Sequence, residues 1–432
     1  MKRHIVIIGN GITGVTAARF IRKLSDHRIT MISDETDYFF SRTALMYVYM
    51  GHMRFEDVKP YKDWFWEKNA ITTVRDYVDE IDTRRKILNL RSGKTLDFDA
   101  LLIATGSKSN KFGWPGEDLI GVQGLYGAPD LEEMERQTRG IDRAVVVGGG
   151  LIGIELAEML HSRHIPVSFL VRESEYMNYA MPPEEAAMIG REIRNHGIDL
   201  RLSAELKAVL GDEQGRARAV VTGSGEDIPC GFVGLTVGVH PNIELATNSG
   251  IETNRGVLVN PYFETSVPDV YAAGDCAEFR DDEVGSARIE QLWYTGRMHG
   301  KTVAQTICGR RSAYDPGPFF NSAKFFTIEW QTYGRIHPLL PEGVETVVWE
   351  DQKENRLMRI DFLADSGSVV GFNLLGIRFR HEICERWLRE KRKIGFVIDH
   401  LREANFDPEF DRTHERSLAR VFRSRQSNRT YA

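Results

Sequence analysis

The amino-acid sequence predicts an α/β fold in which one structural motif occurs twice. Residues 5–35 read as a strand, a glycine-rich turn, a helix and a second strand, and residues 144–173 repeat that order. Beyond about residue 319, short runs rich in β-branched and aromatic residues predict strands, and helical stretches follow them. These three observations predict two Rossmann-like domains and a C-terminal α+β domain.

The first repeat begins with an apolar strand that runs directly into Gly9, Gly11 and Gly14. In a G-x-G-x-x-G pattern the first glycine permits a tight turn, the second lets the backbone approach a pyrophosphate, and the third lets the helix pack closely on the strand. The start of that helix offers unpaired N–H groups and a positive dipole end to an anion. An acidic residue about 20 positions later can hold ribose hydroxyls, with Glu35 the first choice and Asp34 the second. This repeat is therefore predicted to bind a dinucleotide.

The second repeat has the same spacing of Gly148, Gly150 and Gly153 after an apolar strand at 144–147. Its helix is predicted to run to about Arg163. Repetition of the whole strand–glycine–helix–strand motif is stronger support than either copy alone. A chain with two such repeats can hold two dinucleotides.

The C-terminal part, 319–432, lacks a glycine fingerprint. Its basic run at 386–393 has two open interpretations, a docking face for an acidic electron carrier or a solvated helix face. The tail from Asp411 is polar and rich in arginine. Strands are predicted at 325–330, 346–349, 357–362 and 369–375, and helices at 380–391 and 394–403.

Composition excludes several classes of function. The chain has 432 residues, 42% hydrophobic and 27% charged, as in a globular protein of two to four domains. A net charge of -6 and a pI near 6.1 argue against a nucleic-acid partner. No run reaches the roughly 18 apolar residues of an integral membrane segment. The short apolar run at 5–8 is read as a first strand and not as a signal peptide, so a cytoplasmic protein is expected.

The four cysteines are Cys230, Cys276, Cys308 and Cys384. None forms a C-x-x-C pair, so the sequence predicts no metal site and no iron–sulfur or thioredoxin-like chemistry. Reduced thiols are expected, as in cytoplasmic proteins.

Three further motifs accompany the two repeats. Ala104-Thr105-Gly106 follows the strand 100–103, residues 236–242 read T-x-G-x-x-P-N, and Gly274-Asp275 follows an apolar strand. Together with the glycine fingerprints, these motifs resemble the two-dinucleotide-binding flavoprotein superfamily, the pyridine nucleotide-disulfide oxidoreductase class. The resemblance extends over roughly residues 1–320.

The resemblance implies that FAD is bound by the first repeat and the Gly274-Asp275 box. In that class the aspartate of the box reaches the ribityl and pyrophosphate region. The segment after the box brings backbone N–H groups and a helix start to the pyrimidine side of the flavin. The expected FAD-binding residues are Gly9, Gly11, Ile12, Thr13, Gly14, Asp34, Glu35, Arg42, Ala104, Thr105, Gly106, Gly274, Asp275, Gln291 and Leu292.

The resemblance also implies that the inserted second repeat binds NAD(P)H. Glu155 is expected near the nicotinamide carboxamide, and the alternative is a solvated helix acid. NADH enzymes tend to carry an acid where Val171 stands, whereas the following Arg172 can accommodate the 2′-phosphate of NADP. Glu173 argues for NADH, and the balance leans slightly to NADPH. The expected NAD(P)H-binding residues are Gly148, Gly150, Leu151, Ile152, Gly153, Glu155, Arg172, Glu173 and Gly238.

The segment 38–51 separates branches of this class. Disulfide reductases carry redox cysteines there, and this chain has none, so no thiol relay is expected. Arg42 and Leu45 are instead similar to the Y-x-R-x-x-L element of ferredoxin and rubredoxin reductases and of the flavin half of nitrite reductases. Arg42 is expected near the flavin or its pyrophosphate, with a surface salt bridge as the alternative, and Tyr47 stands where such relatives often have lysine. The expected catalytic residues are Glu155, Arg42 and Tyr47.

Two other resemblances stay open. The stretches 37–40, 51–58 and 110–116 are similar to type II NADH dehydrogenases and sulfide:quinone reductases, which sit on membranes through an amphipathic C-terminal region. A flavoprotein with a structural or signalling role, like the apoptosis-inducing factor, is a third possibility.

The resemblance implies three domains. An FAD-binding domain is expected at 1–115 and 246–318, an inserted NAD(P)H-binding domain at 116–245, and a C-terminal α+β interface domain at 319–432 that often forms a dimer contact. The expected function is FAD-dependent NAD(P)H oxidation, with hydride transfer to flavin N5 and direct electron transfer to a small redox protein. The alternative acceptor is a quinone.

Overall fold

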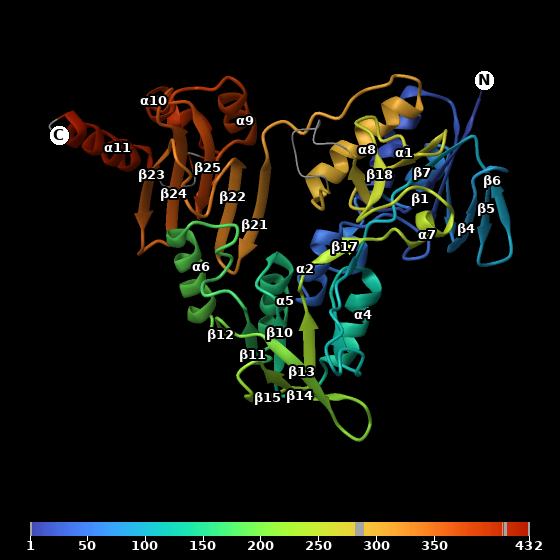
Figure 1. Cartoon of the computed structure of the whole chain (residues 1–432), viewed down its shortest axis with the longest axis horizontal. Helices are drawn as coiled ribbons and strands as arrows, with labels where there is room; N and C mark the ends of the chain where they lie inside the picture. Colours follow the sequence, from blue (N-terminus) through green and yellow to red (C-terminus); the bar gives the residue numbers. More distant parts are fainter. Residues whose placement is uncertain (1, 281–288, 408, 410–412, 431–432) are drawn as a thin grey trace. The chain divides into compact units, whose positions relative to one another are not determined.

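The computed structural model describes residues 2–280, 289–407, 409 and 413–430 (Figure 1). Asp411, where the predicted basic tail begins, lies outside the described residues. Contacts along the chain divide it into two compact units. Unit 1 comprises 1–113, 121–140 and 237–316, and unit 2 comprises 114–120, 141–236 and 317–432.

Unit 1 is built on a parallel sheet in the strand order β19-β7-β1-β2-β3. All residues of β1 are buried, as expected for a central strand of a parallel sheet. The sheet strands are β1 (His4–Ile8), β2 (Arg28–Ser33), β3 (Ile71–Arg75), β7 (Ala100–Ile103) and β19 (Val270–Ala272). The helices are α1 (Ile12–Leu24), α2 (Leu45–Tyr49), α3 (Trp64–Lys68), α4 (Ala128–Gln137), α7 (Glu244–Asn248) and α8 (Trp293–Ile307).

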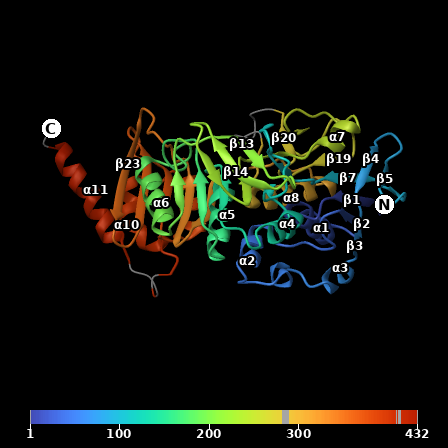
Figure 2. The same ribbon diagram turned by 90° about the horizontal axis from the view of Figure 1, so that it is seen from below.

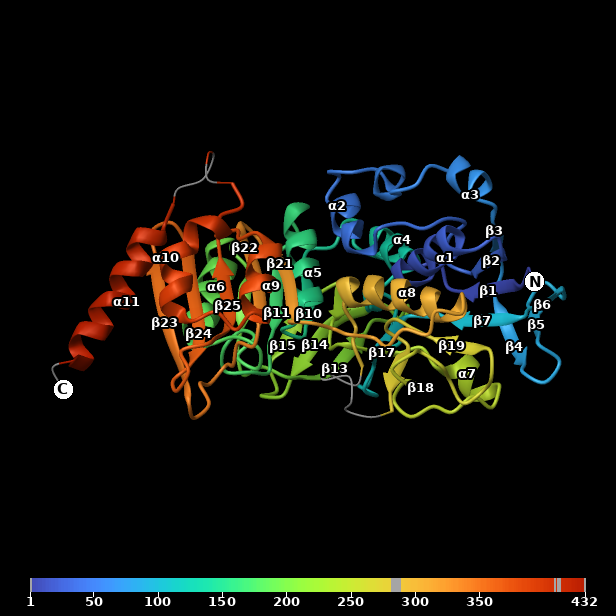
Figure 3. The same cartoon turned by 90° about the horizontal axis from the view of Figure 1, so that it is seen from above.

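The order of β1, α1 and β2 confirms the first predicted repeat. Helix α1 buries Val15, Ala17, Ala18 and Ile21 on one face. The basic residues in its last turn interact favourably with the negative end of the helix dipole. Helix α8 packs against α1, as Figure 3 shows. The smaller strands of unit 1 are β4 (Val78–Asp82), β5 (Ile87–Leu90), β6 (Thr95–Asp97), β8 (Ser107–Ser109), β9 (Val122–Gln123), β17 (Val239–Pro241), β18 (Val257–Val259) and β20 (Ala277–Phe279).

Unit 2 contains the second predicted repeat, in which β12, β11, β10 and β16 lie side by side and parallel. Its strands are β10 (Ala144–Val147), β11 (Val167–Leu170), β12 (Asp199–Arg201) and β16 (Phe232–Leu235), with an antiparallel sheet of β13 (Leu206–Gly211), β14 (Ala217–Thr222) and β15 (Asp227–Pro229). Its helices are α5 (Leu151–Ser162) and α6 (Pro183–Asn195). The predicted α/β class with Rossmann-like sheets is confirmed.

The C-terminal part of unit 2 is an antiparallel sheet in the order β21-β22-β25-β24-β23. The prediction of a single strand over 325–330 is wrong, because the chain reverses direction at Phe326, which has φ +52°. Its elements are β21 (Phe320–Phe325), β22 (Ile328–Gly334), β23 (Val344–Asp351), β24 (Arg356–Leu363), β25 (Val369–Leu375), α9 (His381–Arg389), α10 (Ile394–Ala404) and α11 (Glu415–Thr430).

A buried ion pair connects this last sheet to α6, which Figures 1 and 2 show beside it. Arg359 on β24 donates from Nε to Glu185 Oε1 at 2.6 Å and from Nη2 to Glu185 Oε2 at 3.0 Å. Glu185 is fully buried, so each charged group has the other as its partner in place of water. The C-terminal sheet is therefore part of the same compact body as the second repeat.

Candidate nucleotide-binding sites

The glycine loop of unit 1 has no room for side chains at two of its three glycines. A Cβ on Gly9 would lie 2.1 Å from the carbonyl oxygen of Ala104, and one on Gly14 would lie 2.0 Å from the carbonyl oxygen of Gly9. A Cβ on Gly11 would meet nothing within 4 Å. Gly11 is also the N-cap of α1, so no capping side chain stands before the first-turn N–H groups. The loop thus leaves an open approach to a helix N-terminus, the arrangement that binds phosphate.

Three distant segments close around this loop. Thr105 donates from Oγ1 to the carbonyl oxygen of Asn242 at 2.7 Å, which joins the A-T-G motif to the P-N turn. Gly274 has φ +82°, and a Cβ there would lie 2.4 Å from Thr13 Oγ1. The structure therefore brings together the predicted residues Gly9, Thr13, Thr105 and Gly274.

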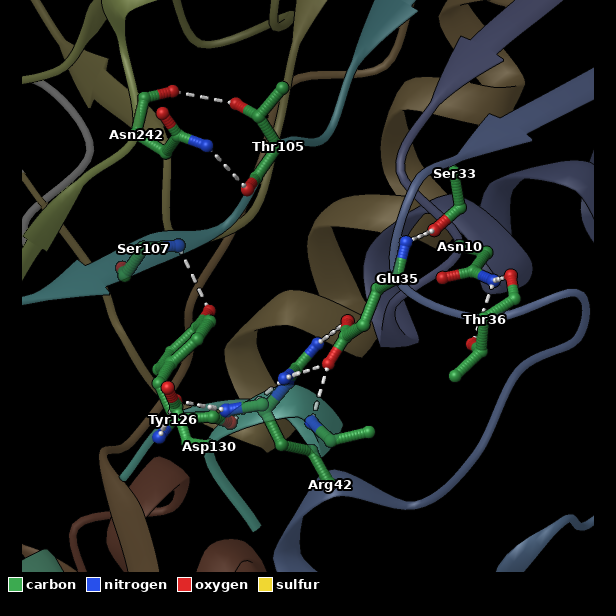
Figure 4. A network of polar contacts seen from close by, with 12 residues as sticks. Asn10, Ser33, Glu35, Thr36, Arg42, Thr105, Ser107, Tyr126, Asp130 and Asn242 are labelled. Atoms are coloured by element: carbon green, nitrogen blue, oxygen red, sulfur yellow. Dashed lines mark hydrogen bonds and ion pairs between the residues drawn. The ribbon is translucent and has the colours of Figure 1, made fainter. Parts of the chain in front are cut away.

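Glu35, predicted as the ribose-binding acid, is engaged by Arg42. The guanidinium donates from Nη1 and Nη2 to the two carboxylate oxygens of Glu35 at 2.9 and 2.6 Å (Figure 4). The backbone N–H of Ala128 donates to Glu35 Oε1 at 2.9 Å. Two predicted residues are thus joined in one half-buried ion pair, in which the side chains of Arg42 and Glu35 are 29% and 18% exposed.

Tyr126 and Asp130 are functional candidates that the sequence interpretation missed. The Arg42 guanidinium lies over the Tyr126 ring, 4.6 Å from its centroid, and donates to the Tyr126 carbonyl oxygen at 2.8 Å. Asp130 fixes this turn, because its carboxylate accepts from the backbone N–H groups of Tyr126 and Gly127 at 2.7 and 2.9 Å (Figure 4). No local motif marks Tyr126; the available signal was the capping pattern of Gly127 before α4 and Asp130 in its first turn.

Asp275 lies at the centre of a polar network in unit 1. Its Oδ2 accepts from the Ser107 and Tyr126 hydroxyls, both at 3.3 Å. Gln291 Nε2 in turn donates to Ser107 Oγ at 2.8 Å. Burial raises the pKa of Asp275 above its usual value, although these hydrogen bonds and Arg42 oppose the rise. A carboxylate with such partners is suited to receive hydroxyl donors from a ligand.

The remaining predicted residues of unit 1 lie on exposed or half-buried positions. Asp34 is exposed, and its carbonyl oxygen accepts from Arg75. Tyr47 is half-buried on α2, with its ring 6.3 Å from that of His52. The half-buried Ile12 and Leu292 stand at the starts of α1 and α8.

The glycine loop of unit 2 repeats the steric pattern of unit 1. A Cβ on Gly153 would lie 2.1 Å from the carbonyl oxygen of Gly148, which has φ +111°. Gly150 is the N-cap of α5, and the half-buried Leu151 and Ile152 open its first turn. The Tyr176 hydroxyl donates to the carbonyl oxygen of Gly150 at 3.2 Å. A second helix N-terminus is therefore presented behind a glycine loop.

Glu155 on α5 has an unusual environment for a carboxyl group. Burial, with the neighbouring charge of Glu158, raises the pKa of Glu155 to about 7. Glu158 itself is buried and accepts from Lys324 at 3.1 Å. Glu155 is thus partly protonated near neutral pH and can donate a hydrogen bond to a carbonyl or amide oxygen.

Arg172 and Glu173 follow β11 as an ion pair between an exposed arginine and a half-buried glutamate. Arg172 Nε donates to Glu173 Oε1 at 2.8 Å, and the Arg172 side chain is 75% exposed. Val171 before them is fully buried. Gly238, predicted for the same nucleotide, lies in unit 1, where a Cβ would approach Asn110 at 3.2 Å.

The residues of both loops suit the phosphates of a dinucleotide. Each loop has a third glycine whose Cβ position is filled by backbone, and each has a helix N-cap without a side chain. In unit 1 the Glu35–Arg42 pair and Asp275 surround the loop. These features define a flavoprotein of the class with two dinucleotide-binding folds.

Comparison with known proteins supports this assignment to a class of flavoproteins. Residues 3–300 match the model of the pyridine nucleotide-disulphide oxidoreductase family, and the chain belongs to this family. It is 29% identical to a rubredoxin-NAD(+) reductase from Ectopseudomonas oleovorans over 75% of this chain and 85% of that protein. The crystal structure of a ferredoxin reductase from Rhodopseudomonas palustris has a TM-score of 0.78 at 24% identity and covers 86% of this chain and 91% of its own.

A longer relative also matches. The chain is 30% identical over 71% of its length to the assimilatory nitrate reductase electron transfer subunit of Bacillus subtilis, but spans only 39% of that protein. Family membership confirms the predicted oxidoreductase class and the use of FAD and NAD(P)H. Among the described residues, none of the helices is long and apolar enough to cross a membrane.

Proposed function

We propose that this protein is an FAD-dependent NAD(P)H oxidoreductase that passes electrons directly to a small redox protein of the rubredoxin or ferredoxin type. The observation that carries this proposal is the presence of two glycine loops, at Gly9–Gly14 and Gly148–Gly153, each opening onto a helix N-terminus. The acceptor class is supported by the rubredoxin-NAD(+) reductase to which the chain is similar.

The residues of unit 1 are proposed to bind FAD. The N–H groups at the start of α1 bind its pyrophosphate, and Asp275 accepts from its hydroxyl groups. The Glu35–Arg42 pair keeps the guanidinium in one orientation beside Tyr126, so that it adds fixed positive charge near the phosphates. Tyr47 is proposed to lie beside the flavin ring.

The residues of unit 2 are proposed to bind NAD(P)H. The start of α5 binds its pyrophosphate, and the protonated form of Glu155 donates a hydrogen bond to the carboxamide oxygen of the nicotinamide. When bound, the two cofactors supply hydride transfer to flavin N5 and the subsequent release of electrons. The chain supplies position and electrostatics.

No thiol is proposed to take part. All four cysteines are free thiols, and Cys276, next to Asp275, is fully buried. Burial raises the pKa of the Cys276 thiol, which makes it a poor nucleophile. Electrons are therefore proposed to leave the flavin without a thiol relay, and free thiols suit the proposed cytoplasmic location.

The test is an anaerobic titration of the purified protein with NADH and with NADPH, followed by the flavin spectrum. Gly11→Ala should weaken FAD binding and Gly150→Ala should weaken NAD(P)H binding, because each added methyl group occupies the phosphate approach. Gly395→Ala is the matched control, since Gly395 lies in α10 with nothing within 4 Å of its Cβ position. A protein that stays colourless after incubation with FAD contradicts the proposal.

The acceptor is tested separately by steady-state reduction of rubredoxins, ferredoxins and a soluble quinone. Faster reduction of a redox protein than of quinone or oxygen supports the proposed acceptor, and the reverse result contradicts it. Charge alone does not identify a docking face in the basic run, because Arg386, Arg389 and Arg392 each pair with a glutamate. A homodimer is also proposed and is checked by light scattering.

A further inference from the structure

A buried histidine lies directly behind the Gly274–Asp275 turn of unit 1. His299 on α8 is 0% exposed. Its ring is enclosed by Phe263, Phe279 and Tyr314, with centroids at 4.8, 5.7 and 4.6 Å. No motif of the sequence includes this residue, and the proposed electron transfer does not use it. A polar ring in such an apolar environment requires specific hydrogen-bond partners.

Both nitrogens of the His299 ring have a partner. The backbone N–H of Gly274 donates to His299 Nδ1 at 3.1 Å. Nδ1 must therefore be the unprotonated nitrogen, and Nε2 carries the hydrogen. His299 Nε2 lies 3.1 Å from Glu290 Oε2, to which it donates. The structure thus fixes a single neutral tautomer of the imidazole.

The carboxylate of Glu290 is itself held in place. Tyr314 donates from its hydroxyl to Glu290 Oε2 at 2.7 Å. Burial and the Glu290 charge raise the pKa of Tyr314 well above its usual value, so the phenol remains a donor. The order of donation is therefore Gly274 to His299 to Glu290, with Tyr314 supporting the last group.

The helix that carries His299 has a fixed position against the first glycine loop. Thr13 on α1 donates from Oγ1 to the carbonyl oxygen of Gly296 at 3.0 Å. A Cβ on Gly300 would lie 2.5 Å from the carbonyl oxygen of Thr13, so only glycine permits this approach. The two helices thus pack closely one residue away from His299, and the imidazole cannot move away from the turn.

The geometry points to His299 as a positioning residue for FAD, an inference that rests on the proposed function of unit 1. By accepting from the Gly274 N–H, the imidazole sets the left-handed turn that presents the Asp275 carboxylate. Glu290 and Tyr314 fix the tautomer that makes this acceptor available. His299 acts through Gly274 and Asp275 and does not itself touch the cofactor.

Three substitutions separate this role from a general contribution to packing. His299→Asn places an amide oxygen near the position of Nδ1 and can still accept from Gly274. His299→Gln extends its polar group toward the position of Nε2 and cannot do so with the same backbone. His299→Leu fills the space without an acceptor. His4→Leu is the matched control, because His4 is also buried in unit 1 and bonds Thr30 at the opposite end of β1.

The experiment measures the FAD dissociation constant of each deflavinated full-length variant by fluorescence titration, together with the visible circular dichroism of the bound flavin. A buried N–H without an acceptor should raise the dissociation constant about tenfold or more in His299→Leu and His299→Gln. His299→Asn should recover most of the affinity and the wild-type dichroism. His4→Leu should change the FAD affinity by less than about twofold, since only stability is affected there.

Equal affinities of the wild type and His299→Leu would overturn the inference, as would equal losses in His299→Asn and His299→Leu. If His299→Leu does not fold, the comparison of His299→Asn with His299→Gln gives the same test. Failure of the wild type to bind FAD would instead defeat the proposed function of unit 1. The affinity for NAD(P)H, measured on the same samples, should be unchanged in every folded variant.

Discussion

The two glycine loops have the same steric design but different surroundings. In unit 1, residues from 35–42, 105–107, 126–130 and 274–275 are joined around the loop by half-buried hydrogen bonds and an ion pair. In unit 2, the hydroxyl groups of Tyr176 and Thr236 donate to the carbonyl oxygens of Gly150 and Gly148 at 3.2 and 3.1 Å, and Arg172, which follows the second strand, is exposed. The first arrangement suits a nucleotide that stays bound, and the second suits one that exchanges.

The largest effects should come from the third glycine of each loop. Gly14→Ala and Gly153→Ala both place a Cβ about 2 Å from a backbone oxygen, at 2.0 and 2.1 Å. We expect Gly14→Ala to abolish FAD retention, while Gly153→Ala abolishes binding of NAD(P)H and leaves a yellow protein. Flavin absorbance and nucleotide titration report the two losses separately. Retention of FAD by Gly14→Ala would contradict the prediction that the third glycine of the first loop is required for nucleotide binding.

A pH effect should distinguish unit 2. The pKa of Glu155 is raised to about 7, whereas an unfolded glutamate titrates near 4.3. Between these values the folded state binds more protons, so the contribution of Glu155 to stability is largest below about pH 4, falls as the pH rises to about 7, and levels off above that. Glu155→Gln should remove this loss and stabilise the protein at pH 8 by at most about 4 kcal/mol.

Thermal unfolding of the cofactor-free protein at pH 5 and pH 8 measures this difference. The exposed Glu175 provides the control, since Glu175→Gln should leave the pH dependence unchanged. Parallel pH profiles of wild type and Glu155→Gln would contradict the assigned pKa.

The ion pairs of the two loops should differ in their effect on stability. Arg42→Met leaves the Glu35 carboxylate, which is 18% exposed, without its bidentate partner. A fully buried pair costs about 3–5 kcal/mol when broken, and the partial exposure here reduces the expected loss to about 2 kcal/mol. Arg172→Met removes an exposed partner and should cost less than about 1 kcal/mol. Denaturant unfolding measures both, and equal losses would contradict the contrast.

The sequence was sufficient for the two repeats because their signals are local. Glycine spacing, apolar strands and helix starts all lie within about 30 residues, the length of one βαβ motif. The pairing of Tyr126 with Arg42 and with Asp275 joins residues 84 and 149 positions apart, and no local pattern specifies either contact. His299 was missed for the same reason, because a single histidine in a helix has no signature.

In the C-terminal sheet, local signals were not sufficient to predict the strand boundaries. Composition predicted its strands, but a run of aromatic and β-branched residues hid the reversal at Phe326, where the chain adopts φ +52° without glycine. Propensity identifies residues suited to a sheet and does not locate every turn between its strands. Sequence therefore predicted the class of this region better than its boundaries.

The smallest expected effect concerns the choice between NADH and NADPH in unit 2. The Arg172 side chain is 75% exposed and forms an ion pair with Glu173. Because such an exposed pair contributes little stability, Arg172 can turn toward a 2′-phosphate at a small cost in free energy. Arg172→Ala should raise the dissociation constant for NADPH about fivefold to tenfold and leave that for NADH nearly unchanged, as a single exposed charge-assisted contact allows. Glu173→Gln should favour NADPH slightly, because the guanidinium loses its competing partner. Titration of the oxidised protein with NADP⁺ and NAD⁺ isolates binding from electron transfer, and an equal effect of Arg172→Ala on both nucleotides would exclude Arg172 as the residue that distinguishes them.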